Sequence, residues 1–179
     1  MLPEVLSNGI CSLNAHEDRN AMSCIMEIDK AGRVLHYKIG PSLINVGRRC
    51  SYNEVFKAID QDIVPDDLAP FMALLHRLHE VSLILNQMRV RRGALDFDFP
   101  EYRVLLDHDG NPLRIVKRDR TLAERLIEEC MLIANETVAT HLKNTQRPTV
   151  YRIHERPSAD KIGTFQTVIN HLGHRVMLN

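Results

Sequence analysis

The first part of the chain carries the pattern of a β-hairpin. Residues 22–28 are typical of a strand, residues 29–32 (Asp-Lys-Ala-Gly) of a turn, and residues 33–39 of the returning strand. Pro41 is expected to break the second strand or to mark a sheet edge, because proline donates no hydrogen bond to a neighbouring strand. Residues 43–46 are apolar enough to resume it.

A second hairpin is predicted further along the chain. Residues 101–106 and 113–117 flank the turn sequence of residues 107–111, Asp-His-Asp-Gly-Asn. Just before this hairpin, residues 95–99 alternate apolar with acidic side chains, which indicates an extended segment. A short apolar strand is expected at residues 150–153.

Helical spacing of apolar residues predicts most of the remaining chain. The expected helices cover residues 3–6, 52–59, 66–92, 121–143 and 158–173. Two of them begin at capping boxes, Ser51 with Glu54 and Thr121 with Glu124. The apolar stripe expected on the helix of residues 121–143 consists of Ile127, Cys130, Met131, Ala134 and Val138. The predicted fold class is α+β, with antiparallel β-hairpins packed against long α-helices.

Composition narrows the class of protein. The chain has 179 residues, 44% hydrophobic and 26% charged, which suits one packed domain. Its 23 basic and 23 acidic residues cancel, which excludes a binder that depends on overall positive charge but not a local basic groove. No apolar run reaches the roughly 18 residues of a membrane span, and no signal peptide is recognisable, so no membrane association is expected. Scattered cysteines (Cys11, Cys24, Cys50 and Cys130) are typical of reduced thiols in a cytoplasmic protein.

Several blocks of the sequence resemble the catalytic domain of the ribonuclease II / ribonuclease R family, the RNB domain. They are MLPEVLSNGICSLN at residues 1–14, RRGALDF at 91–97 followed by Pro100-Glu101, RLIEECMLIAN at 125–135 and YRIHERP at 151–157. The blocks occur in the family's order and at about its spacing, over nearly the whole chain, and they are most similar to the ribonuclease R branch.

The resemblance implies a reaction. Enzymes of this family hydrolyse single-stranded RNA from the 3′ end and release nucleoside 5′-monophosphates, with Mg²⁺ held by clustered carboxylates that orient water and neutralise the scissile phosphate. The family's cluster of four aspartates is expected upstream of Met1, and its arginine motif, final glutamate and flanking OB-fold domains outside the chain as well. Residues 1–179 therefore resemble the central portion of one RNB-type catalytic domain, without catalytic residues or metal ligands of their own.

Asp60, Asp62, Asp66 and Asp67 do not match the family's aspartate cluster, since they lie in a different block, around a proline-containing helix start. We interpret them as charges of a solvated turn and a helix N-terminus.

The resemblance also implies three contacts with single-stranded RNA. Tyr52 aligns with a tyrosine that contacts the terminal ribose, Phe97 with a phenylalanine on which a terminal base stacks, and Glu128 with a carboxylate that accepts a hydrogen bond from a ribose hydroxyl. Stacking on an aromatic ring tolerates any base, and a 2′-hydroxyl distinguishes RNA from DNA.

The residues themselves leave structural alternatives open. Phe97 could belong to the core beside Leu95 and Phe99, Tyr52 could be a half-buried anchor, and the Glu128–Glu129 pair could be solvated. At about 100° per residue, Glu128 lies roughly 110° and Glu129 roughly 150° from the centre of the apolar stripe, so Glu128 is expected nearer the packed edge.

Other polar residues carry weaker signals. A basic run could track phosphates or form a solvated face; it comprises Arg114, Lys117, Arg118, Arg120 and Arg125. Arg89, Arg91 and Arg92 are explained by the dipole at a helix C-terminus. His76 and His79, three residues apart, could share a zinc ion, but no third ligand stands out. Tyr151, Arg152 and His154 receive no role.

The primary hypothesis is thus an inactive fragment of a Mg²⁺-dependent exoribonuclease that retains RNA positioning. The alternative is a non-catalytic RNA-binding or protein-interaction module on the same scaffold. Because part of the domain is expected to be missing, apolar faces should be exposed and should favour self-association.

Overall fold

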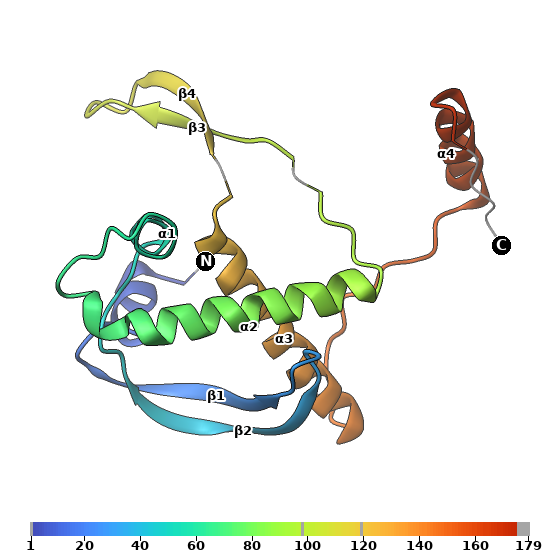
Figure 1. Ribbon diagram of the computed structural model, residues 1–179. Coiled ribbons are helices and arrows are strands. Elements are labelled where there is room, and N and C mark those ends of the chain that lie inside the picture. Colours follow the sequence, from blue (N-terminus) through green and yellow to red (C-terminus); the bar gives the residue numbers. More distant parts are fainter. Residues whose placement is uncertain (1, 98, 119, 175–179) are drawn as a thin grey trace. The chain divides into compact units, whose positions relative to one another are not determined.

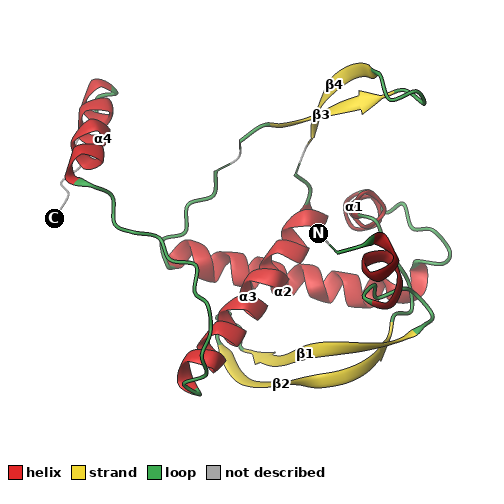
Figure 2. Ribbon diagram, turned by 180° about the vertical axis from the view of Figure 1, so that it is seen from behind, coloured by secondary structure: helices red, strands yellow, loops and turns green. Residues whose placement is uncertain are grey.

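The computed structural model describes residues 2–97, 99–118 and 120–174. The chain divides into two units, Met1–Thr145 and Gln146–Asn179. The strands are β1 (Asp18–Ile28), β2 (Val34–Asn45), β3 (Glu101–Leu106) and β4 (Pro112–Arg118), and the α-helices are α1 (Tyr52–Asp60), α2 (Met72–Arg91), α3 (Leu122–Asn144) and α4 (Ala159–His171). Two antiparallel hairpins and separate helices confirm the α+β prediction (Figures 1 and 2).

The first hairpin is longer and more continuous than predicted. Its strands pair from Asp18 opposite Asn45 to the turn. The prediction that Pro41 breaks β2 is wrong, whereas the alternative of an edge position is confirmed: Pro41 lies within β2, opposite Met22. In a two-stranded sheet each strand has an unpaired edge, so a missing N–H is tolerated there.

The turn of this hairpin packs against α2. Gly32 has a φ of +86°, and a Cβ atom at this position would lie 3.0 Å from Cβ of Met88. Both the backbone conformation and the close approach therefore require glycine. Figures 1 and 2 show the β1–β2 ribbon beside the crossed helices α2 and α3.

Both predicted capping boxes form. The Ser51 side chain accepts a hydrogen bond from the Glu54 backbone N–H at the start of α1. At the start of α3, the Glu124 carboxylate accepts one from the Thr121 backbone N–H at 3.0 Å. These reciprocal bonds satisfy N–H groups that have no partner inside a helix, which explains why both starts could be predicted locally.

The predicted start of the long helix at residue 66 is wrong. The α-helix begins at Met72, after a short 3₁₀ turn (Ala69–Phe71) that contains Pro70. Proline has no N–H to donate to a carbonyl four residues earlier, so a regular α-helix does not extend through this segment. The turn places Leu68 fully inside the core.

The two ends of the chain differ from the predictions in part. The helix predicted at residues 3–6 is a π-helical turn (Val5–Ile10) with non-helical backbone at Gly9. The strand predicted at residues 150–153 is wrong: the segment is irregular and Val150 is 98% exposed. A strand requires a partner to pair with, and an apolar sequence alone does not supply one. The last helix is confirmed, with Ser158 as its N-cap.

The core of the first unit lies where α1, α2 and α3 meet. Its buried apolar residues are Val55, Ala58, Leu68, Leu85, Ala123, Leu126 and Ile133. The stripe predicted for α3 is wrong, because Ile127 and Met131 are exposed whereas the buried face includes Glu129 and Thr137. The prediction used hydrophobicity alone and therefore placed the buried face on the neighbouring side of α3. None of the described helices combines the length and the apolar character that crossing a membrane requires.

One face of the β3–β4 hairpin is apolar and exposed. Tyr102, Val104 and Leu106 alternate along β3, and Ile115 of β4 pairs directly with Val104. All of these side chains are exposed. A face of this kind favours association with another apolar surface.

We therefore expect the chain to self-associate through this face. Light scattering should give a mass above 20.5 kDa that rises with concentration. The double substitution Val104→Lys/Ile115→Glu keeps a favourable cross-strand pair but removes apolar surface, and should lower the mass. The matched substitution Arg103→Lys/Val116→Glu, at the neighbouring pair on the opposite face, should not. A monomeric mass at every concentration would contradict the prediction.

Candidate functional site

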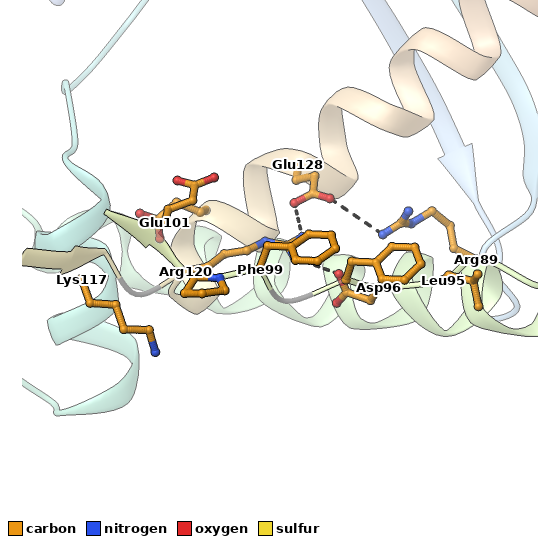
Figure 3. A pocket seen from close by; sticks show the side chains of 11 residues that line it. Arg89, Leu95, Asp96, Phe99, Glu101, Lys117, Arg120 and Glu128 are labelled. Atoms are coloured by element: carbon orange, nitrogen blue, oxygen red, sulfur yellow. Dashed lines mark hydrogen bonds and ion pairs between the residues drawn. The ribbon is translucent and has the colours of Figure 1, made fainter. Parts of the chain in front are cut away.

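A hollow of the first unit lies between the end of α2, the segment that follows it, the base of the second hairpin and the start of α3. Its volume is about 830 Å³. The lining residues are Arg89, Leu95, Asp96, Phe97, Phe99, Pro100, Glu101, Lys117, Arg120, Glu124 and Glu128. Figure 3 shows this pocket, and we refer to it below as the aromatic pocket.

Glu128 extends from α3 into this pocket between two arginines (Figure 3). Its Oε2 is hydrogen-bonded to Nη2 of Arg120, and its Oε1 lies 3.9 Å from Nη2 of Arg89. Arg120 also donates to Oδ1 of Asp96 at 2.9 Å, and this bond lowers the pKa of Asp96. The same two carboxylates raise the pKa of Arg120. One guanidinium thus joins α3 to the segment that carries Phe97.

Glu129, the next residue, is buried instead. It is 3% exposed, and its carboxylate accepts hydrogen bonds from Nε of Arg89 at 3.0 and 3.1 Å and from Nη2 at 2.9 Å. Nδ2 of Asn86 donates to it as well, at 2.9 Å. The prediction that Glu128 lies nearer the packed side of the helix is therefore wrong. The pocket nevertheless contains Glu128 and not Glu129, so the RNA contact of Glu128 stays a prediction.

Phe97 lies at the surface of the pocket and not in the core. It is 64% exposed, and its ring stacks on Phe99 with centroids 5.6 Å apart and planes 13° from parallel. Leu95 and Phe99 are exposed too, so the alternative that these residues form core is wrong. A stacked pair of exposed rings is a platform on which a planar group can stack.

Tyr52 is not brought into the aromatic pocket. It lies half-exposed in the first turn of α1. One turn further, Phe56 lines a second hollow of about 420 Å³, to which Arg125 and Glu129 also contribute. Arg120 lines both hollows, so the two adjoin. The structure thus unites Phe97 with Glu128 and leaves Tyr52 on a separate element.

The ion pairs of the arginines were not predicted from the sequence. Arg89 of α2 and Arg92, the residue after its end, form ion pairs with Glu129 and Glu136 of α3 respectively, beyond any effect on the helix dipole. Of the basic run, Arg120 is ion-paired and Lys117 lines the pocket. The side chain of Arg118 lies outside the described residues. Glu129 lies at helical spacing from Leu126 and Ile133, on the same face of α3. A glutamate that shares a face with buried apolar residues is the signal in the sequence that could have indicated a buried ion pair.

The described residues do not fit a Mg²⁺ site. In residues 2–97, 99–118 and 120–174, no three histidine, cysteine or acidic side chains are grouped so that they could hold a metal ion. In the pocket, Asp96 and Glu128 are paired with arginine. Asp67, in the acidic turn after α1, is ion-paired with Arg48. The described acidic residues of the pocket and of the turn after α1 are thus engaged with arginine and are not grouped as Mg²⁺ ligands.

The comparisons agree with these features. The family model described as RNB domain matches residues 1–177. Ribonuclease R 1 of Lactococcus lactis is 46% identical over 92% of this chain and 20% of its own length, and ribonuclease R of Thermotoga maritima is 41% identical over 98% and 25%. Mycoplasma genitalium RNase R, solved in complex with ribose-methylated single-stranded RNA, superposes with a TM-score of 0.92 at 31% identity, over 99% of this chain and 28% of its own. The chain thus spans about a quarter or less of the length of these curated relatives.

We expect the Arg89–Glu129 pair to be needed for the crossing of α2 and α3. Arg89→Met leaves a buried carboxylate unpaired and should lower the free energy of unfolding by about 3 kcal/mol or more, measured by urea denaturation. The double substitution Arg89→Met/Glu129→Met should restore most of this loss. The exposed Arg92–Glu136 pair is the control, and Arg92→Met should cost less than about 1 kcal/mol. Equal losses for Arg89→Met and Arg92→Met would contradict the assignment.

Proposed function

Because this chain belongs to the RNB-domain family, we propose that it forms the central, substrate-positioning part of the catalytic domain of a 3′-to-5′ exoribonuclease of the ribonuclease R type. The complete enzyme would act in the cytoplasm, hydrolyse single-stranded RNA and release nucleoside 5′-monophosphates. The observation that best supports a positioning role is the pocket that combines exposed aromatic rings with Glu128 held by arginine.

Phe97 is the proposed stacking residue. Its exposed ring is supported from one side by Phe99, which leaves the other side for a nucleobase. Stacking of a base on an aromatic side chain contributes about 1–3 kcal/mol and depends little on the base. This tolerance suits an enzyme that must accept every nucleotide in turn.

Glu128 is the proposed acceptor for a ribose hydroxyl. Its Oε2 is occupied by Arg120, whereas its Oε1 is 3.9 Å from Arg89, beyond hydrogen-bond length. Oε1 therefore retains the capacity to accept a hydrogen bond from a 2′-hydroxyl. Arg120 fixes the carboxylate through one oxygen and so orients the other, which favours RNA over DNA.

Tyr52 is proposed to contact the terminal ribose from α1. Its half-exposed phenol, one turn from Phe56 of the second hollow, offers a hydroxyl and a ring to a strand that extends past Arg120. The hydrolytic step is assigned to acidic residues outside this chain, with Mg²⁺ as their metal.

Binding of short labelled oligonucleotides by fluorescence anisotropy tests the positioning role. Phe97→Leu should weaken binding of single-stranded RNA and DNA alike, by roughly tenfold, because it removes the ring. Glu128→Gln should weaken binding of RNA selectively. Phe165→Leu, at an exposed phenylalanine of α4, is the matched control. The proposal would be contradicted if the wild-type chain bound neither RNA nor DNA, or if Phe97→Leu had no effect on binding.

The assignment of hydrolysis to other residues has its own test. We expect the purified 179-residue chain with Mg²⁺ to release 5′-nucleotides from single-stranded RNA no faster than buffer, as measured by chromatography of the products. Release well above the buffer rate would show that the chain supplies its own metal ligands. If a natural, complete gene product with this sequence bound RNA without metal and without hydrolysis, the alternative of a non-catalytic RNA-binding module would be favoured.

A further inference from the structure

A third hollow, of about 470 Å³, lies at the N-terminal part of the chain and has no role in the pocket described above. Its lining consists of Asn8, Ser12, Leu13, Asn14 and Arg49. We refer to it as the asparagine hollow. Four of these five residues come from the N-terminal segment, and Arg49 comes from the connection between β2 and α1.

The N-terminal segment is held against the end of β2 by long-range bonds. Ala15 forms a parallel bridge with Val46, and the backbone N–H of His16 donates to the Val46 carbonyl at 2.8 Å. Nε of Arg19 donates to the Ser12 carbonyl at 3.0 Å. Because Val46 lies three residues before Arg49, these bonds fix the segment close to that arginine. The hollow is therefore formed by a segment that hydrogen bonds hold in place.

The described lining of the hollow offers hydrogen-bond donors. Arg49 carries five N–H donors, and it makes no ion pair or side-chain hydrogen bond within the described part of the chain. Nδ2 of Asn14 makes one long bond to the Asn8 carbonyl, at 3.5 Å, and Nδ2 of Asn8 makes one to Glu4 at 3.1 Å, so each amide retains a second N–H. No described residue of the lining is acidic. A site with this donor set suits an anion.

The neighbouring arginine, Arg48, is engaged in the fold. The side chain of Arg48 is 13% exposed and pairs with Glu54 at 2.6 Å and Asp67 at 2.8 Å. Its hydrogen bond lowers the pKa of Glu54 to about 2. Arg48 thus joins the start of α1 to the acidic turn after it. Arg49, one residue further along the chain, is exposed and has no ion-pair partner among the residues that the structure describes.

We propose that the asparagine hollow binds a backbone phosphate of single-stranded RNA through Arg49, with the amides of Asn8 and Asn14 as secondary donors. This inference rests on the proposed function and adds a contact area whose lining residues differ from those of the aromatic pocket. A guanidinium matches the geometry of a phosphate and binds it with paired hydrogen bonds. A backbone contact carries no information on sequence or sugar, so it would act equally on RNA and DNA.

The test compares Arg49→Gln with Arg77→Gln, an exposed arginine of α2 that lines none of the hollows described above. Anisotropy with labelled single-stranded RNA and DNA is measured at about 50 and about 200 mM salt. Arg49→Gln should weaken binding of both polymers about tenfold at the lower salt concentration. At the higher salt concentration, the ratio between the wild-type and variant affinities should be roughly two- to threefold smaller. The reason is that the variant makes one phosphate contact fewer, so its affinity depends less on salt. Arg77→Gln should behave as wild type.

The outcomes separate this inference from the proposed function. Absence of RNA binding by the wild type would overturn both. Wild-type binding that Arg49→Gln leaves unchanged, while Phe97→Leu weakens it, would overturn only the phosphate contact. Thermal unfolding in inorganic phosphate, against chloride at equal ionic strength, distinguishes the source of the anion. A stabilisation by phosphate that Arg49→Gln abolishes, without any change in RNA affinity, would assign the hollow to free phosphate and overturn the RNA contact.

Discussion

The buried ion pair between Arg89 and Glu129 is the constraint on which the site depends. A carboxylate that is 3% exposed is tolerated only because Arg89 and Asn86 donate to both of its oxygens. Both donors belong to α2 and the acceptor to α3, so the pair fixes one helix on the other at one place along each. The apolar core around Leu85 and Leu126 supplies most of the burial, and the ion pair specifies the register.

The geometry of the aromatic pocket follows from this crossing. Since Arg89 is held by Glu129, its guanidinium lies near Glu128, and Arg120 binds Glu128 from the other side. Arg120 also holds Asp96, the residue before Phe97. A chain of charge pairs thus extends from the helix interface to the exposed ring. In the proposed function, this pairing orients the Glu128 carboxylate so that its second oxygen can accept a hydrogen bond from a substrate hydroxyl.

The sequence predicted the parts of the fold that short-range interactions decide. These are the capping boxes at Ser51 and Thr121 and the turn of the second hairpin. In each of them, the residues that interact lie within a few positions of one another in the sequence. The start of α2 was not predicted, because Pro70 has no backbone N–H to donate. The irregular segment at residues 150–153 was not predicted either, because the sequence does not show whether a strand has a partner to pair with.

The site was predicted less completely, and for a related reason. Helical spacing gave a stripe through Ile127 and Met131, but a stripe shows only which residues share a face and not which face α2 covers. The covered face carries Glu129, so residue polarity misled the ranking of the two glutamates. The resemblance to a family named Phe97 and Glu128, which the fold brings into one pocket, whereas no local pattern indicated Arg120 as the residue that connects them.

The ion pairs formed on folding determine which charged side chains of this chain remain available to a ligand. A net charge of zero says little about RNA binding, because many of the arginines are engaged with carboxylates of the same unit. Arg48 and Arg49 are adjacent residues of the same type, yet among the described residues only Arg48 has acidic partners. The proposed phosphate site therefore consists of a cation without an acidic partner among the described residues, in a hollow whose described lining has no acid. A neutral protein can in this way bind a polyanion at a few points, with a salt dependence that counts those points and not its total charge.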